Sequence, residues 1–210
     1  IFDVDIPRFL ECHKRLKTTA TILTHPNSHP YDSGIIIADK NGKATGWLHK
    51  EDRRLWYKNR VNAGMHLLSP DIFRYFPNLR KRDLDRDILE PLISAQELGI
   101  YDSPEYIRDM GTPNRYRSVA GDIRSHQIEA RNLGNRQKAI FLDRDGTLNR
   151  YVGFLTDIDD LELTEGAAEA VRKINASGYL AIVVTNQPVI ARGEVSPKEL
   201  EEIHNKMETL

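Results

Sequence analysis

The chain has one cysteine, Cys12, among its 210 residues, so it cannot form an internal disulfide. Such scarcity is typical of a reducing compartment, and we expect a cytoplasmic location. No apolar run approaches the ~20 residues that cross a bilayer, and no signal peptide opens the sequence, so we expect no membrane partner. The 30 basic and 31 acidic residues nearly cancel, which gives no sign of a nucleic-acid partner.

The remaining composition is that of an ordinary globular protein, with 40% hydrophobic and 29% charged residues. This length suits one large domain or two small ones. The first residue is Ile1 rather than methionine, and the run 1–5 reads as the continuation of a strand. We therefore expect the chain to be a fragment that is cut at its N-terminal end.

Residues 1–120 mix helical and extended patterns. A helical pattern follows Pro7, and strand-like residues fill 18–24 and 61–67. The pair Asn41–Gly42 between two extended runs predicts a hairpin. Ser69 before Pro70 predicts a helix start, and Pro91 should kink or shorten a helix over 83–93.

A change of pattern follows the polar, glycine-containing segment 121–137, which we interpret as a helix end and an interdomain linker. Residues 138–210 alternate strand and helix. The strand at 139–142 is expected to be buried, and the apolar strand at 179–184 to be covered on both faces. Ser196 and Glu199 predict a capping box at the start of the last helix. The fold class is therefore α/β.

Two carboxylates, Asp143 and Asp145, follow the first of these strands, and Gly146 opens the turn. A carboxylate can attack phosphorus, and a neighbouring acid can move the proton. Thr185 and Asn186 end the second strand, so a right-handed crossover would bring their neutral donors near Asp143. Two acids close together also favour Mg²⁺, which prefers oxygen ligands.

A lone Asp-x-Asp is usually a solvated turn, but the whole pattern of strand, Asp-x-Asp-Gly-Thr, helix, strand and Thr-Asn is far more specific. It resembles the haloacid dehalogenase-like phosphatases. The runs 141–149, 184–187 and 190–193 are similar to the branch containing D-glycero-D-manno-heptose 1,7-bisphosphate phosphatase and histidinol-phosphatase. That branch usually has Ser-Gly where this chain has Pro188 and Val189.

The resemblance implies a Rossmann-like domain with a parallel sheet. It makes Asp143 the nucleophile and Asp145 the acid/base, with both carboxylates at the magnesium site. Gly146 lets backbone amides approach the phosphate, Thr185 and Asn186 hold it, and Arg192 either reaches a substrate oxygen or is a solvated loop charge.

The same family requires a lysine from a third motif and an acid from a fourth, and many members carry a zinc loop. We expect all three after Leu210, so that zinc would belong only to the missing part. Residues 138–210 are thus expected to hold the nucleophile half of a haloacid dehalogenase-like domain.

An upstream set of motifs, in the runs 47–51, 61–65 and 106–116, resembles the C-terminal part of sugar-1-phosphate nucleotidyltransferases. The resemblance implies that Asn62 and Gly64 contact the sugar, that Lys50 contacts its phosphate and that Asp109 binds Mg²⁺. Lys50 is equally a solvated strand-end residue, and Asp109 can also cap the helix beginning near Thr112. The family's glycine-rich nucleotide loop would precede Ile1, so this half should be inactive alone.

These observations predict an internal piece of a fused enzyme. Its regions are a partial nucleotide-diphospho-sugar transferase domain (1–120), a linker (121–137) and a partial phosphatase domain (138–210). The expected partners are a small sugar phosphate and, in the full-length parent, a nucleoside triphosphate. The alternatives are a phosphatase acting on histidinol phosphate or another small ester, and a non-catalytic ligand-binding fragment.

Overall fold

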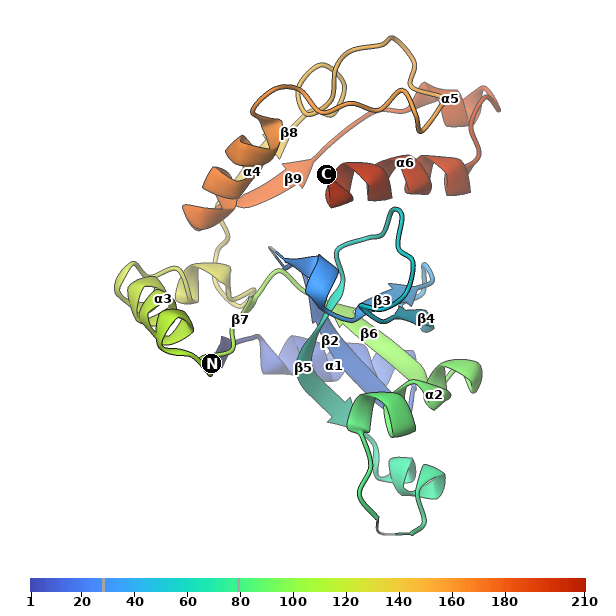
Figure 1. Cartoon of the computed structure of the whole chain (residues 1–210), viewed down its shortest axis with the longest axis vertical. Helices are drawn as coiled ribbons and strands as arrows, with labels where there is room; N and C mark the ends of the chain where they lie inside the picture. Colours follow the sequence, from blue (N-terminus) through green and yellow to red (C-terminus); the bar gives the residue numbers. More distant parts are fainter. Residues whose placement is uncertain (28, 79) are drawn as a thin grey trace. The chain divides into compact units, whose positions relative to one another are not determined.

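The computed structural model describes residues 1–27, 29–78 and 80–210, which divide into two compact units. The N-terminal unit comprises residues 4–53 and 59–107, and the C-terminal unit comprises residues 1–3, 54–58 and 108–210. Each contains helices and strands, which confirms the α/β class (Figure 1). The predicted boundaries at 120 and 138 remain a prediction.

The N-terminal unit is built on a five-stranded mixed sheet in the order β4-β3-β5-β2-β6. Its strands are β2 (Ala20–His25), β3 (Ile35–Ala38), β4 (Ala44–Leu48), β5 (Val61–Leu68) and β6 (Leu98–Asp102). Strand β2 lies between β5 and the edge strand β6, and it pairs antiparallel with β5 and parallel with β6. The predicted hairpin at 41–42 joins β3 to β4, and Gly42 there has a φ of 86°, a conformation that glycine adopts without strain.

Short helices surround this sheet. They are α1 (Ile6–Leu16), η1 (Pro30–Asp32), η2 (Pro70–Tyr75), η3 (Asp85–Leu89) and α2 (Pro91–Ser94), and the short strand β7 (Tyr106–Ile107) ends the unit. Ser69 caps η2 by accepting a hydrogen bond from the Asp71 amide, as its position before Pro70 predicts. Pro91 separates the π-helical turn η3 from α2, so the expected interruption is confirmed.

Among the described residues, two clusters of apolar side chains belong to the core of this unit. In one, Ile22, Leu89, Leu92 and Leu98 are completely buried. In the other, Phe9 of α1 stacks on Tyr101 with 5.0 Å between ring centroids. Burial of its apolar face therefore fixes α1 against the edge strand β6.

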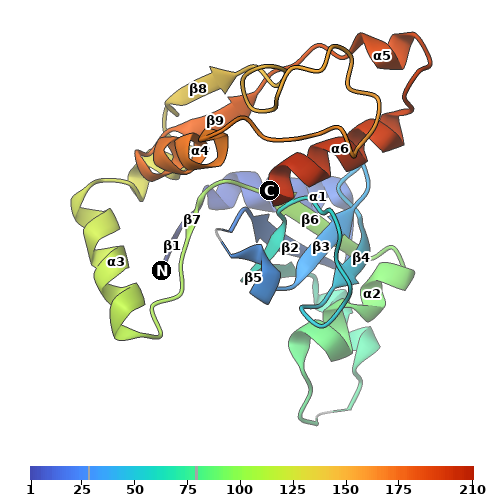
Figure 2. The ribbon, with the colours of Figure 1, turned by 45° about the horizontal axis from the view of Figure 1, so that its top comes forward.

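The C-terminal unit contains the parallel pair β8 (Ala139–Leu142) and β9 (Leu180–Val183), with α4 (Ala167–Ala176) packed beside β9 (Figures 1 and 2). Its other elements are β1 (Phe2–Asp3), α3 (Pro113–Arg124), η4 (Glu129–Arg131), α5 (Pro188–Ala191) and α6 (Pro197–Thr209). The predicted capping box is present: Ser196 and Glu199 each accept a hydrogen bond from the other's backbone amide.

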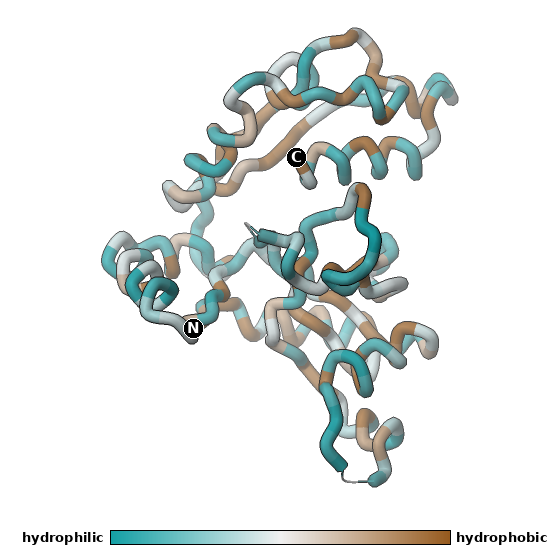
Figure 3. The backbone as a smooth tube through the Cα atoms, viewed as in Figure 1, coloured by the Kyte–Doolittle hydropathy of each residue, from teal (hydrophilic) through white to brown (hydrophobic). Residues whose placement is uncertain are grey.

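Helix α6 alternates hydrophobic and hydrophilic residues, as Figure 3 shows. Ile203 on its apolar side is 1% exposed and packs with Leu155 and Leu161. Lys206 donates to the Ile158 carbonyl at 2.7 Å. These contacts hold α6 against the loop that follows β8.

The expected burial of the two strands in this unit is wrong. Phe141 of β8 is 69% exposed. Val183, the last residue of β9, is 39% exposed, and Val184 after it is 58% exposed. The pair forms a sheet of two strands, with α4 beside it. An apolar run indicates a strand, but burial on both faces requires a second covering layer, which the sequence pattern cannot count.

Across the described residues, no helix is both long and apolar enough to span a membrane.

Candidate active site

The ends of β8 and β9 bring the predicted phosphatase residues to one edge of the sheet. Leu142 is the register partner of Val183, and the Val184 amide donates to the Leu142 carbonyl at 2.8 Å. Asp143 and Thr185 therefore leave neighbouring strands at the same end. The β-α-β pattern predicted that Asp143 and Thr185 come to the same edge of the sheet, and they do so because both strands run in the same direction.

Asp143 is exposed, and its Oδ1 accepts a hydrogen bond from the Arg144 amide at 2.7 Å. Within the described part of the chain, no donor contacts its Oδ2. One carboxylate oxygen is thus oriented by the backbone while the other is open to an incoming group. This is the arrangement that a nucleophilic carboxylate needs.

Asp145 is held by the side chain of Arg144, which is completely buried. The guanidinium Nη2 lies 2.9 Å from Oδ1 and 3.0 Å from Oδ2 of Asp145, and Nε lies 3.1 Å from Oδ1. Asn149 donates a further bond to Oδ1 at 3.2 Å. Such charge-assisted contacts fix the carboxylate in one orientation.

The electrostatic balance favours the ionised form of Asp145. Partial burial acts to raise the pKa of Asp145, but hydrogen bonds from Gln187 and Arg144, together with the Arg144 charge, outweigh it and lower that pKa. The carboxylate is therefore a proton acceptor in this state.

Gln187 links the two strand ends, a role that the sequence analysis missed. Its Nε2 donates to Asp145 Oδ2 at 2.8 Å and to Thr185 Oγ1 at 2.7 Å, while its Oε1 accepts from Arg144 Nη2 at 2.8 Å. Because Thr185 Oγ1 is the acceptor here, its own proton is available to a phosphate oxygen. The position of Gln187 directly after the Thr-Asn pair was the only signal that could have pointed to it.

The turn after Asp145 depends on Gly146, which has a φ of 80° and donates its amide to the Asn149 carbonyl at 2.8 Å. A side chain would strain this turn. Both Gly146 and Asn186 are exposed at the strand ends.

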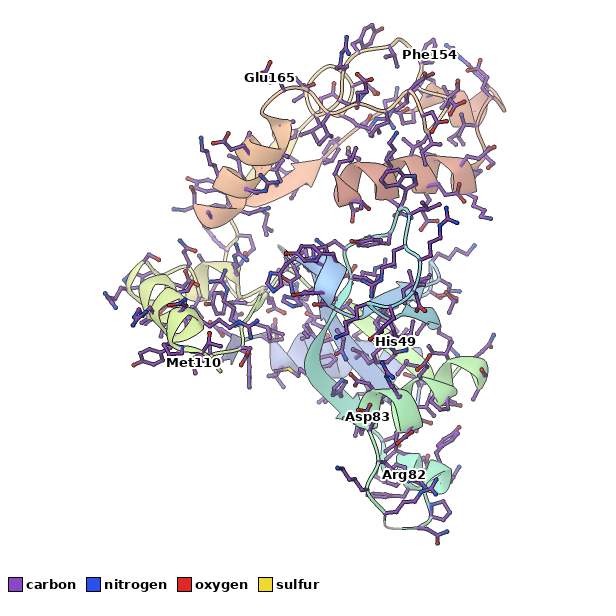
Figure 4. The ribbon with its side chains drawn as sticks, viewed as in Figure 1. His49, Arg82, Asp83, Met110, Phe154 and Glu165 are labelled. Carbon is purple, nitrogen blue, oxygen red and sulfur yellow. The ribbon has the colours of Figure 1, made fainter. Side chains whose placement is uncertain are left out.

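Arg192 lies in a cation–π contact, with its guanidinium carbon 4.2 Å from the centroid of the Phe154 ring. Both side chains are exposed, and Figure 4 labels Phe154 on the segment between β8 and α4. The predicted substrate contact of Arg192 remains a prediction, now with an aromatic partner that the sequence did not reveal.

In the N-terminal unit, Asn62 is fixed on β5. Its amide donates to Asp85 Oδ2 at 3.2 Å, and its oxygen accepts from the Gly64 amide at 2.9 Å. Gly64 has a φ of 73°, and a Cβ built on it would meet open space. A backbone open to a ligand is compatible with the predicted sugar contact.

His66 and Asp85 form a polar pair beside Asn62 that the motif did not predict. Burial lowers the pKa of His66, with Asp85 opposing, and burial raises the pKa of Asp85, with His66 opposing. Nε2 of His66 is buried and has no hydrogen-bond partner among the described residues. This pair makes the surroundings of Asn62 sensitive to protonation.

The other two predicted residues lie at exposed positions. Lys50 is exposed, whereas the preceding His49, labelled in Figure 4, contacts Glu90 Oε2 at 3.0 Å. Asp109 is exposed in the C-terminal unit, accepts from the Gly111 amide and pairs with Arg115. The Gly111 bond and the Arg115 contact lower the pKa of Asp109.

The helix after Asp109 is capped by another residue. Thr112 accepts from the Arg115 amide at 3.3 Å, so the alternative in which Asp109 caps that helix is wrong.

Comparison with known proteins gives matches to part of the chain. A D-glycero-beta-D-manno-heptose-1,7-bisphosphate 7-phosphatase of Haemophilus ducreyi is 43% identical over 72 residues, which are 34% of this chain and 40% of that protein. The protein of the same name from Pasteurella multocida is 52% identical over 60 residues, 29% of this chain and 33% of its own length. These relatives confirm the resemblance to the heptose-bisphosphate phosphatase branch.

The chain spans only 32% to 40% of the length of the first three of these relatives. No protein-family model matches it. A presumed glucose-1-phosphate thymidylyltransferase from Bacillus anthracis, solved with sucrose, superposes with a TM-score of 0.48 at 18% identity, over 58% of this chain and 50% of that one.

Proposed function

We propose that the C-terminal unit carries the nucleophile part of a phosphatase that hydrolyses a sugar phosphate through an aspartyl-phosphate on Asp143. The observation that carries this proposal is the hydrogen-bonded bridge from Asp145 through Gln187 to Thr185, at the end of two parallel strands. Partial matches to heptose-bisphosphate phosphatases support the same chemistry.

In the first half-reaction, the open oxygen of Asp143 forms a bond to phosphorus while the bond to the leaving oxygen breaks. Thr185 donates its hydroxyl proton to a phosphate oxygen, and Asn186 offers an amide. Asp145 supplies a proton to the leaving oxygen, for which the negative charge of a bound phosphate must first raise the pKa of Asp145.

In the second half-reaction, Asp145 takes a proton from water, and the water oxygen attacks the phosphorus of the acyl-phosphate. The ionised state held by Arg144 and Gln187 suits this step directly. The oxygen of Asp143 is then released with both electrons of its bond to phosphorus, which restores the carboxylate.

We also propose a Mg²⁺ ion at Asp143. Oδ1 of Asp143 accepts one backbone hydrogen bond and keeps a second lone pair for the ion, which leaves the open Oδ2 for attack on phosphorus. Mg²⁺ retains several water ligands. The Asp145 carboxylate fits less well, because its oxygens already accept bonds from Arg144, Gln187 and Asn149. No group of three His, Cys, Asp or Glu side chains in the described ranges is arranged to hold a metal. When bound, the ion would neutralise charge on the transferring phosphate.

Among substrates, we propose a heptose 1,7-bisphosphate, with histidinol phosphate or another small ester as the alternative. The N-terminal unit is proposed to be the sugar-binding part of a nucleotidyltransferase, with Asn62, Gly64 and Lys50 at the sugar phosphate. Asp109, which belongs to the C-terminal unit, is proposed separately as a metal ligand. A nucleoside triphosphate would then be the second substrate of the full-length protein. We propose a cytoplasmic location, a role in surface-polysaccharide synthesis and no nucleic-acid or membrane partner.

The aspartyl-phosphate is tested with beryllium fluoride, which mimics it and does not require turnover. We expect ¹⁹F NMR of the 210-residue chain with Mg²⁺ to show a bound fluoroberyllate signal that disappears in D143N and persists in D160N. Asp160 is a matched control because it is an exposed aspartate of the same unit. A signal that persists in D143N would overturn the assignment of the nucleophile.

The substrate is tested by phosphate release from heptose 1,7-bisphosphate and from histidinol phosphate, measured on the same protein and on D143N. Release from the bisphosphate alone would support the proposed substrate. Release from histidinol phosphate alone would establish the alternative. A fluoroberyllate adduct without release from either compound would identify a ligand-binding fragment.

A further inference from the structure

The buried guanidinium of Arg144 has a partner on helix α6. Its Nη1 lies 3.2 Å from Nε2 of His204, while Nη2 and Nε contact Asp145 and Gln187. An arginine side chain has only donors, and it stays protonated in proteins. The imidazole nitrogen in this contact must therefore be the acceptor.

An imidazole that accepts at Nε2 is neutral and carries its proton on Nδ1. The charge environment agrees with this. Burial lowers the pKa of His204, the Arg144 charge lowers it further, and Asp145 and Glu201 act in the opposite direction. Protonation would place two cations against each other.

We propose that His204 is a positioning residue for Asp145: as the neutral Nδ1–H tautomer it fixes the Arg144 guanidinium on both oxygens of that carboxylate. The proposal rests on the proposed function, because it assigns His204 to the acid/base of the same site. It extends the site from the two strand ends to a helix that the motifs did not include.

The position of His204 is fixed by the contacts of helix α6. The neighbouring Ile203 is buried between Leu155 and Leu161, and Lys206 is tied to the Ile158 carbonyl. The helix starts at a complete capping box. Loss of the imidazole would leave Nη1 buried without its acceptor, and the guanidinium would then turn toward another partner.

The first test is the tautomer, which does not depend on catalysis. The 210-residue chain is labelled with ¹⁵N-histidine, and the His204 signals are identified as those that are missing from the spectrum of H204Q. We expect Nδ1 to be protonated and Nε2 to show the shift of an unprotonated acceptor. A proton on Nε2, or an imidazolium at pH 7, would overturn the proposal.

The second test compares H204Q, whose amide oxygen can still accept from Arg144, with H204L, which cannot. E202Q on the exposed side of α6 is the control. We expect the ¹³C carboxyl signal of Asp145 to move in H204L and to stay near its wild-type position in H204Q and E202Q. Equal spectra in H204L and the wild type would refute the positioning role even if the protein had no phosphatase activity.

Where phosphate release is measurable, H204L should lower kcat by about tenfold, equivalent to ~1.4 kcal/mol of barrier, with little change in KM. H204Q should recover most of that loss. A wild type that forms no fluoroberyllate adduct would end the proposed function, whereas the tautomer and the Asp145 signal would still decide the role of His204.

Discussion

Arg144 and Asp145 allow a quantitative test of how the strand-end site is held together. The arginine side chain is completely buried and the aspartate side chain is 20% exposed. Removing one member of a buried ion pair typically costs 3–5 kcal/mol, because the other charge stays behind without its partner. Since Asp145 retains some access to water, we expect R144M to destabilise the C-terminal unit by about 3 kcal/mol.

A double-mutant cycle separates the pair from the rest of the site. D145N alone strands the buried guanidinium, whereas R144M/D145N removes both charges, so the double variant should cost less than the sum of the singles. We expect a coupling energy of about 2 kcal/mol, within the usual range for contacting residues. The exposed pair Arg150–Glu162, with its atoms 2.7 Å apart, is the matched control and should show little coupling.

The assay must report on the right unit. Because the chain divides into two compact units, we would follow hydrogen exchange of the β8 and β9 amides across a urea series, with far-UV circular dichroism for the whole chain. A cost for R144M no larger than that of R150M, or an additive R144M/D145N cycle, would refute the reasoning about the buried pair.

Three further predictions concern single residues. Because the pKa of His66 is lowered in the folded chain, the unfolded chain binds more protons than the folded chain below about pH 6.5. The free energy of unfolding should therefore fall as the pH falls through the folded pKa of His66. H66F should flatten that pH dependence in urea melts at pH 5 and pH 8. S196A removes a helix cap and should cost about 1 kcal/mol in the same melts, and an unchanged midpoint would contradict the capping box. G64A should lose about 1 kcal/mol through its positive φ, without any clash, and G121A serves as a control at a helical glycine.

The backbone features that sequence could predict are those set by local chemistry. Asn41–Gly42 predicted a hairpin because few other pairs fit a tight turn, and Pro91 predicted an interruption because it lacks an amide proton. The Ser196 capping box is similarly specified by four consecutive residues. Each of these features is satisfied by near neighbours in the chain.

The side-chain network around Asp145 could not be predicted in this way. Arg144, Gln187 and His204 meet only after two strands and a helix have packed, and each has many alternative partners in the sequence. The motif did place Asp143 and Thr185 on neighbouring strands, because strand direction follows from topology. It could not show that Asp145 would be bound to a buried guanidinium.

The short parallel pair in the C-terminal unit also affects how the protein should behave in solution. Strands that leave large apolar side chains such as Phe141 exposed to water offer an apolar surface and unpaired backbone groups to another molecule. Purified material is therefore expected to sediment as larger species when concentrated and to return to monomer on dilution. A charged replacement, F141K, would suppress this clustering without touching either carboxylate of the strand tip.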